Sequence, residues 1–396
     1  MQCYSVNFSN GLCPKECCRL ISCISLDMIY LEKIPKGWQP PHCPNHNCKF
    51  HNPLQKGFLC KKDGTYLRKT DNRRIQRYSC LSCKRSFSTQ TFSVTYWLKN
   101  PRLIKDVFMK TVGCMANRQI ARDLRLNPVT IDRIIARMAR HCYLFHIRNI
   151  LKTPPPKEIV IDGFVSFERS QYYPFHHHNA VEKDIDFFWY FTDSEVRRSG
   201  TMTGKQAARR DELEELFGRP DPQAVRKDVT HLIEVTLRNG LSAVVHSDGH
   251  QSYPRAIQDT KCDITHVVTS GKDHRDKHNR LWSINLLDSL IRHSNSNHKR
   301  ETIAWSKRRQ SSADRLVIFL VWRNYIKVRR EKKQKGYSPA MARGMHDHRL
   351  SVEEIFSRRI FRDHVDLPDR WSRYYDRKVV TRSLPRNTVH DLIYAR

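Results

Sequence analysis

The segment Glu158–Phe164, with the sequence EIVIDGF, constrains the fold of this chain more than any other stretch. It follows a run of three prolines at Pro154–Pro156, which marks a linker. The apolar run inside it predicts a short buried β-strand. Asp162 comes at the end of this run, and Gly163 lets the backbone turn away from the carboxylate. The segment therefore predicts a strand that presents one carboxylate at the edge of a sheet.

A second segment repeats this arrangement. Leu241–Val245 predicts another short apolar strand, and Asp248 and Gly249 follow it closely. Between the two, Tyr172–Val181 and Asp186–Thr192 predict antiparallel neighbours of the first strand. Charged segments predict helices around Arg210–Phe217 and Asp228–Arg238. Strands and helices that alternate in this way predict an α/β domain.

Three consecutive histidines, His176–His178, lie in the second predicted strand. Successive side chains of a strand point to opposite faces, so His176 and His178 would face away from His177. We therefore expect these side chains to be structural or to face a substrate, and not to form a metal site.

A metal site at this sheet edge requires a third carboxylate, and we predict Glu301. It lies in Asn297–Arg309, where we expect a helix with Trp305 on the same face, packed beneath the carboxylate. Asp288, in an apolar segment, and Asp314, after a Ser-rich break, are the alternatives.

Three carboxylates without Cys ligands suit Mg²⁺ or Mn²⁺. Such a set can hold two ions roughly 3.5–4 Å apart, one at the attacking oxygen and one at the leaving oxygen. This is the chemistry of phosphodiester cleavage and transfer. The alternative is that Asp162 and Asp248 are turn residues and Glu301 a surface residue.

Two cysteine pairs near the N-terminus predict a zinc site. Cys80 and Cys83 have the Cys-x-x-Cys spacing, and Cys43 and Cys48 form a wider pair with four residues between them. Four thiolates suit a tetrahedral Zn²⁺ ion, which would supply folding energy to so small a module. The wide first pair leaves His46, His51 or Cys60 as substitute ligands. The loop between the pairs is basic, and we expect its Lys61 and Lys62 to contact phosphates.

Residues 101–150 predict a helix-turn-helix. Asn117 suits the N-cap of a helix over Arg118–Leu124, and a break follows it. Asn127 and Pro128 suit the N-cap and first turn of a second helix. Ile131, Ile134, Ile135 and Met138 form one buried stripe of that helix. Thr130, Arg133 and Arg137 lie off the stripe, where a recognition helix meets DNA. An ordinary pair of packed helices is the alternative.

The charge of the chain favours a polyanionic partner. It has 71 Lys and Arg against 40 Asp and Glu, a formal net charge of +31 and a pI near 9.9. Nucleic acid fits best. Binding to a membrane surface is disfavoured, because the sequence lacks the amphipathic basic helix that such binding would need. A ribosomal-type scaffold is the alternative. Thirteen cysteines, no secretory signal and no spanning segment predict a reducing compartment that contains DNA, such as the bacterial cytoplasm and nucleoid.

The order of these parts resembles the bacterial insertion-sequence transposases of the DDE type. The residues that carry the likeness are Gln76–Phe87, Ile159–Asp162, Ser247–Tyr253 and Glu301–Arg308, within about residues 40–330. The wide first cysteine pair departs from the family pattern. So does the charged helical insert before Asp248, which we expect to contact element ends or a second subunit.

The resemblance implies a zinc ribbon, a helix-turn-helix and a ribonuclease-H-like mixed sheet with flanking helices. It also implies that Asp162, Asp248 and Glu301 form the acidic triad, with Lys307 and Arg308 on DNA. The partners would be element ends and target DNA, bound by a homo-oligomer.

The expected domains are an N-terminal extension at 1–39, the ribbon at 40–92 and the helix-turn-helix at 100–150, then the catalytic domain at 157–335 and a C-terminal region without an assigned role at 336–396. Two other functions remain open: a DNA-binding regulator on an inactive version of the fold, and a plain Mg²⁺-dependent nuclease. A recombinase with a covalent Ser or Tyr nucleophile is disfavoured, because it would not need three carboxylates.

Overall fold

The computed structural model describes residues 38–45, 47–51, 56–69, 72–238, 242–331 and 336–384. Nearly all of the extension expected at 1–39 lies outside these residues. Within them the chain is an α/β structure with two separate sheets, one of three strands and one of five. None of the helices in the described part is both long and apolar enough to cross a membrane.

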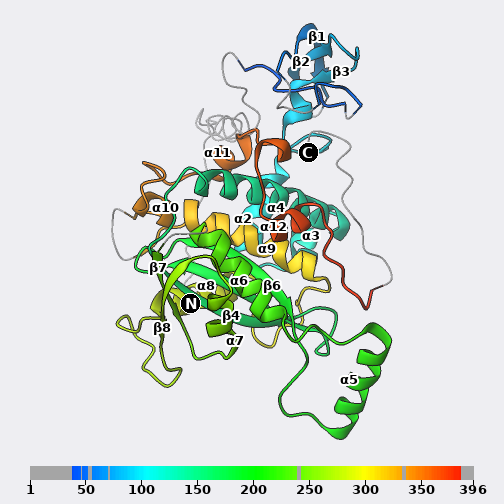
Figure 1. Ribbon diagram of the computed structural model, residues 1–396. Coiled ribbons are helices and arrows are strands. Elements are labelled where there is room, and N and C mark those ends of the chain that lie inside the picture. The colour runs from blue at the N-terminus through cyan, green and yellow to red at the C-terminus, as the bar shows by residue number, and fades with distance from the viewer. Residues whose placement is uncertain are drawn as a thin grey trace, which may run out of the picture.

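The small sheet lies at one end of the molecule (Figure 1). Its antiparallel strands are β1 (Cys60–Arg68), β2 (Arg73–Cys80) and β3 (Ser86–Ser88), followed by the 3₁₀ turn η2 (Thr89–Phe92). A few aromatic rings form its core, among them Tyr78 and Phe87, whose centroids are 5.9 Å apart. So small a core needs an additional source of folding energy.

Three helices connect the small sheet to the large one: α2 (Leu103–Val112), α3 (Asn117–Asp123) and α4 (Pro128–Ile150). The predicted start of α4 is confirmed, because the Asn127 side chain accepts a hydrogen bond from Val129 N at 2.8 Å and Pro128 opens the first turn. The predicted stripe is also buried, at Ile131, Ile134, Ile135 and Met138.

The large sheet has the strand order β6-β5-β4-β7-β8. Its strands are β4 (Glu158–Phe167), β5 (Pro174–Glu182), β6 (Phe188–Glu195), β7 (Ser242–Ser247) and β8 (Asp263–Val268). β4, β5 and β6 are antiparallel neighbours, whereas β7 is parallel to β4 and β8 is parallel to β7. The strands expected from the sequence are therefore confirmed, with ends shifted by a few residues.

Helices cover both faces of this sheet. α8 (Trp282–Ser294) and α9 (Arg309–Val321) pack on the face of β5 that carries His177 and Asn179. α6 (Ala224–Leu237) packs on the opposite face, together with α7 (Ser252–Gln258). α4 packs against α9 and so joins the helical region to the sheet. The expected helix over Asn297–Arg309 is wrong, since turns connect α8 to α9.

One helix stands apart from this core. α5 (Gly204–Phe217) projects beyond the large sheet (Figure 1) and buries none of its residues. An ion pair between Arg197 Nε and Glu214 Oε1, 2.7 Å long, connects it to the chain that follows β6. The helical insert predicted between β6 and β7 is therefore confirmed as two helices, one exposed and one packed.

The C-terminal region folds back onto the core. It comprises the π-helical turn η3 (Trp322–Ile326), α10 (Pro339–Ala342), α11 (Val352–Ser357), the short turn η4 (Arg362–His364) and α12 (Asp369–Tyr375). Trp371 is completely buried, and its Nε1 donates a 3.0 Å hydrogen bond to the carbonyl of Phe191 in β6. This region, which had no role in the sequence analysis, completes the core beside the sheet.

Candidate active site and metal centre

The four predicted cysteines come together beside the small sheet. The thiol sulfurs of Cys43, Cys48, Cys80 and Cys83 all lie within 4.8 Å of one another. The sulfurs of Cys43 and Cys83 are 3.6 Å apart and those of Cys48 and Cys80 are 3.9 Å apart. Zn–S bonds of about 2.3 Å in a tetrahedron give sulfur separations of about 3.8 Å. The four thiols are therefore close enough together to hold one Zn²⁺ ion.

Two of the possible substitute ligands, His51 and Cys60, do not belong to this group. The Nδ1 atom of His51 lies 2.9 Å from the carbonyl oxygen of Cys43, and Cys60 pairs with Cys80 across the strand ladder. His46 lies outside the described residues. Burial opposes ionisation of Cys83, but hydrogen bonds from the Arg85 backbone and neighbouring side chains outweigh it and lower its pKa to about 7. A thiolate is therefore available near neutral pH.

The large sheet brings Asp162 and Asp248 side by side. β4 and β7 are parallel, and their last paired residues are Val160 and His246. Each aspartate lies two residues beyond its member of that pair, so parallel strands carry the two carboxylates to the same place. The Oδ1 atom of Asp162 accepts a 2.7 Å hydrogen bond from Gly163 N. The predicted pairing of these strand ends is thus present in the structure.

The third carboxylate at this place belongs to Asp288, on α8. Asn179 lies opposite Asp162 in the ladder between β4 and β5, and its Nδ2 donates a 3.3 Å hydrogen bond to Asp288 Oδ1. Tyr253 of α7 is buried within electrostatic reach of all three carboxylates. Asp162, Asp248 and Asp288 therefore form one acidic cluster on the face that α8 covers.

The carboxylates of this cluster repel one another when they are ionised. Burial raises the pKa of Asp162 to about 6, and the nearby Asp248 carboxylate adds to the increase. Burial and the charge of Asp162 raise the pKa of Asp288 to about 7. The guanidinium of Arg292 acts in the opposite direction on both groups. Carboxylates held together at a cost are the usual setting of a cation site or an acid–base site.

The carboxylates of this cluster are the ligand type of a hard divalent cation, but among the described residues only the four thiols have all their ligand atoms within 4.8 Å of one another. Three carboxylates supply the oxygen ligands that Mg²⁺ and Mn²⁺ prefer. The amide oxygen of Asn179, buried next to Asp288, has no hydrogen-bond partner among the described residues and is a further oxygen donor. A cation here would offset the electrostatic cost of ionising both buried aspartates.

The structure does not bring Glu301 into this cluster. Glu301 is exposed, in the turns between α8 and α9, with a left-handed φ of 51°. The groups that act on Asp162 include Asp248, Arg275 and Arg292, and Glu301 is not among them.

The expectation that Glu301 lies on a helix is wrong for a local reason. Buried polar side chains bond to one another in this segment, as Asn297 Nδ2 does to Ser306 Oγ at 2.9 Å, and such bonds compete with helical ones. Trp305 does not pack beneath a carboxylate, since its Nε1 donates to the carbonyl of Arg169. Asp314, the other alternative, is buried in α9 beside Gln310 and Arg377 and is not part of the cluster.

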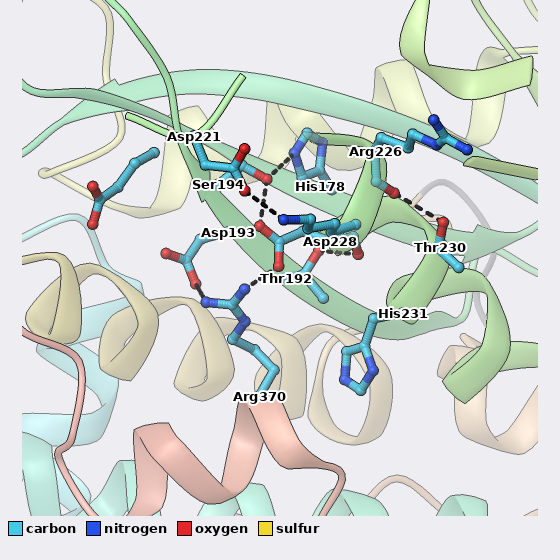
Figure 2. A network of polar contacts seen from close by, with 12 residues as sticks. His178, Thr192, Asp193, Ser194, Asp221, Arg226, Asp228, Thr230, His231 and Arg370 are labelled. Atoms are coloured by element: carbon cyan, nitrogen blue, oxygen red, sulfur yellow. Dashed lines mark hydrogen bonds and ion pairs between the residues drawn. The ribbon is translucent and has the colours of Figure 1, made fainter. Parts of the chain in front are cut away.

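A buried polar network connects His178 of β5 with α6 and α12 (Figure 2). His178 Nε2 is 2.9 Å from Ser194 Oγ, and that hydroxyl donates to Asp228 Oδ2 at 2.8 Å. Arg370 of α12 binds the other oxygen of Asp228. Because the Ser194 proton points to Asp228, His178 donates from Nε2. A Cβ on Gly163 would meet His178 Nδ1 at 2.9 Å, so only glycine fits beside Asp162.

His177 faces the other way, with its Nε2 atom 2.8 Å from Ser312 Oγ of α9. The three histidines therefore alternate between the two faces of the sheet, as predicted. Burial lowers the pKa of His177 to about 4, so this side chain is neutral at physiological pH.

The residues predicted to contact DNA are placed differently from one another. Arg133 is exposed on α4, and Thr130 is half-buried one turn before it. Lys61 and Lys62 are exposed on β1. Lys307 is exposed with its Nζ 3.2 Å from the centre of the Trp305 ring, and Arg308 is half-buried at the start of α9.

Arg137 is not placed to contact DNA, contrary to the prediction. Its Nη1 donates to the carbonyl oxygen of Val94 at 2.9 Å and to that of Tyr96. Burial lowers its pKa to about 10, which leaves it charged at neutral pH. The helical period placed this side chain off the buried stripe, but residues 94–96 cover that side of α4.

The sequence analysis did not identify two residues that interact with the acidic cluster, Asn179 and Arg292. For Asn179 a signal was available, because an uncharged amide in an apolar strand next to a predicted acidic site is a candidate ligand or positioning group. Arg292 lies one helical turn after Asp288, a spacing that puts both on one face of α8.

Comparisons with known proteins add little to this description. No protein-family model matches the chain, and no curated protein does either. Among solved structures, one match is a chain of the cryoEM structure of the simian T-cell lymphotropic virus intasome in complex with PP2A regulatory subunit B56 gamma. That match covers 50% of this chain and 58% of the other, with 12% identity and a TM-score of 0.21. A similarity this weak defines neither a fold family nor a function.

Proposed function

We propose that this protein is a DNA transposase of the DDE type, like those of bacterial insertion sequences, with Asp288 in place of the expected glutamate. It would bind the ends of a mobile DNA element and catalyse Mg²⁺-dependent cleavage and strand transfer. The single observation that carries the proposal is the meeting of Asp162, Asp248 and Asp288 at one sheet face. The surplus of 71 basic over 40 acidic residues, beside so concentrated an acidic cluster, supports a polyanionic substrate for it.

The topology of the large sheet supports a ribonuclease-H-like catalytic domain. Its central strand β4 has an antiparallel hairpin on one side and two parallel strands on the other. The acids come from the central strand, from the end of its parallel neighbour and from the helix that follows β8. This order matches the order in which such a domain brings its carboxylates together, although the third acid is 40 residues after the second (288 − 248) and is an aspartate.

Each residue of the cluster has a role in this proposal. When bound, two Mg²⁺ ions would activate the attacking oxygen and stabilise the leaving oxygen of the phosphodiester. The three aspartates would hold the ions, and the Gly163 N–H would fix the orientation of the Asp162 carboxylate. Arg292, which already faces two of the acids, is placed to bind a non-bridging phosphate oxygen.

The remaining parts supply DNA binding. The four-cysteine site is proposed to hold Zn²⁺ and to stabilise the small sheet, whose Lys61 and Lys62 would contact phosphates. Arg133 on α4 would enter a major groove. Because thiolates have to stay reduced and DNA has to be present, we place the protein in the cytoplasm on the nucleoid. Two element ends held together require an oligomer on DNA, and the exposed helix α5 is the element we propose for that contact.

The test is a cleavage and joining assay with purified protein, Mg²⁺ and the DNA that flanks the coding sequence in its genome. We expect the wild type to nick the element end and to join the freed 3′-hydroxyl to target DNA. Asp162→Asn, Asp248→Asn and Asp288→Asn should each abolish both steps while DNA binding persists, because no phosphate contact is removed. Glu301→Gln is the matched control and should retain both steps.

Three outcomes would contradict the proposal in different ways. A wild type that binds but never cleaves would be a regulator. Cleavage without joined products would identify a plain nuclease. Loss of activity in Glu301→Gln together with full activity in Asp288→Asn would restore Glu301 as the third acid.

A further inference from the structure

A groove between the small sheet and the segment that follows it, from η2 to Leu98, has no role in the proposed reaction. Its volume is about 440 Å³. Its walls carry the aromatic rings of Tyr66, Tyr96 and Trp97 and the guanidinium groups of Arg68 and Arg77. The other lining residues are uncharged, and none is an Asp or a Glu. The groove is therefore aromatic and carries two basic groups, of which Arg77 also forms a 3.8 Å ion pair with Asp63 outside the lining.

Trp97 is held in a conformation that folding alone does not favour. Its side chain is 73% exposed, although burying a ring of this size is among the larger gains available to a folding chain. Its φ angle is 61°, in the left-handed region that bulky residues avoid. Both features have a cost, and such costs concentrate at ligand-binding positions.

The segment that carries Trp97 is rigidly supported. Arg137 of α4 donates to two backbone carbonyls within it, those of Val94 and Tyr96. Gln90 Nε2 bonds to the Thr95 hydroxyl at 2.5 Å, in a part of the chain that is buried. The buried charge of Arg137 therefore fixes the segment, and the Trp97 ring is presented without a loop that has to order on binding.

We propose that this groove binds an unpaired DNA nucleotide, with the base stacked on Trp97 and the adjoining phosphates next to Arg68 and Arg77. Stacking on an aromatic ring needs an exposed base face, which a paired base inside a duplex does not offer. Two guanidinium groups, of which Arg77 also pairs with Asp63, suit an anionic ligand and not a neutral or cationic one, and the phosphates of a nucleotide supply that charge beside a base that can stack. The choice of DNA over another nucleic acid rests on the proposed function.

The test is a binding comparison between two DNAs, measured by fluorescence anisotropy without Mg²⁺. One is a plain duplex and the other is the same duplex with one unpaired 2-aminopurine nucleotide. We expect the wild type to prefer the second DNA and to quench the 2-aminopurine. Trp97→Ala should reduce that preference roughly 5- to 150-fold, the range for loss of one stacked base, and leave duplex binding unchanged.

Two further variants control this measurement. Trp97→Phe keeps a ring and should recover most of the preference, whereas Tyr337→Ala removes an aromatic side chain that is 58% exposed outside the groove and should change nothing. Tyr66→Ala tests the opposite wall and should also reduce quenching. Zinc content and circular dichroism establish that each variant is folded.

The proposal is overturned if the wild type shows no preference for the unpaired nucleotide, or if Trp97→Ala weakens both DNAs equally. These results are independent of catalysis, because the assay contains no Mg²⁺ and works equally in an Asp162→Asn background. If the protein fails to cleave DNA but quenches 2-aminopurine through Trp97, the proposed transposase function is refuted and nucleotide binding in the groove is retained. If it cleaves and joins DNA but does not quench 2-aminopurine, only nucleotide binding in the groove is refuted.

Discussion

Replacing Asp288 by Asn should stabilise the metal-free protein, and the gain should depend on pH. The pKa of Asp288 is raised from 3.8 to about 7, mainly by burial and then by the charge of Asp162. At 1.36 kcal/mol per pKa unit, a shift of roughly three units destabilises the folded state by about 4 kcal/mol once the carboxylate is ionised. An amide is neutral at every pH and removes this cost, and its oxygen can still accept the hydrogen bond from Asn179.

The direction of the effect follows from proton binding. Between pH 4 and pH 7 the folded state holds a proton on Asp288 that the unfolded state has released, so wild-type stability falls as pH rises. Below pH 4 both states are protonated and the penalty is absent. The gain from Asp288→Asn should therefore be about 1.5 kcal/mol at pH 5 and about 4 kcal/mol at pH 8.

Urea unfolding followed by circular dichroism measures this difference. The buffers should contain no Mg²⁺ and no chelator, so that the zinc site stays intact. Adding Mg²⁺ at pH 8 should then stabilise the wild type and have little effect on the variant, because ligand binding to the folded state alone raises its stability.

Glu301→Gln is the matched control, since it makes the same change of charge in an exposed turn. It should alter stability by less than about 0.5 kcal/mol at either pH. An equal gain for Asp288→Asn at pH 5 and pH 8, or a gain of the same size in Glu301→Gln, would refute the assignment of Asp288 to the buried cluster.

Four other changes test separate parts of the structure. Cys80→Ser should lower the zinc content below one ion per chain and expose the small sheet to proteolysis, and full zinc content would contradict the four-thiolate site. Gly163→Ala should cost about 1–3 kcal/mol and reduce cleavage, because the new methyl group meets His178, and pairing it with His178→Ala should recover part of the loss. Arg137→Ala should lower the preference for the unpaired nucleotide by loosening the segment that carries Trp97, and should leave duplex binding unchanged. Arg133→Ala should instead lower the preference for element ends over random DNA in anisotropy titrations, and an unchanged ratio would place sequence recognition elsewhere.

The sequence predicted those parts of the site that depend on local order. The strand preceding Asp162 and that preceding Asp248 are apolar and short, and the parallel register then brings the two carboxylates together without further information. The second cysteine pair has the Cys-x-x-Cys spacing that is typical of zinc sites, and the thiols of the first pair lie close to it.

The position of Asp288 beside Asp162 depended on packing that the sequence does not show. Asp288 lies among the apolar residues of α8, and this setting argued against a metal ligand when only the sequence was considered. The same setting is what buries the carboxylate once α8 packs across β4 and β5. Glu301 has basic neighbours and a tryptophan nearby, as expected of a site, but buried Asn and Ser side chains turn the chain there.

Arg137 and the C-terminal region show the same limit. Helical periodicity identifies which side of α4 faces its own helical partners, but not that residues 94–96 return to cover another side. Likewise, Trp371 contacts Phe191 across 180 positions, a pairing that no local pattern indicates.

The buried Asp193 of β6 has a consequence for how the protein is made. Burial favours its neutral form, but Arg309 and Arg370 outweigh this and hold its pKa below the usual value. Arg370 is synthesised 177 residues after Asp193 (370 − 193), which takes roughly 10–35 s at ribosomal rates. A chain released before α12 would keep this carboxylate without one of its cations, and breaking a buried ion pair costs about 3–5 kcal/mol. All three acids of the cluster are therefore translated before Arg370 can pair with Asp193 in the sheet that carries two of them. A prematurely terminated polypeptide would contain the three acids but lack this stabilising ion pair.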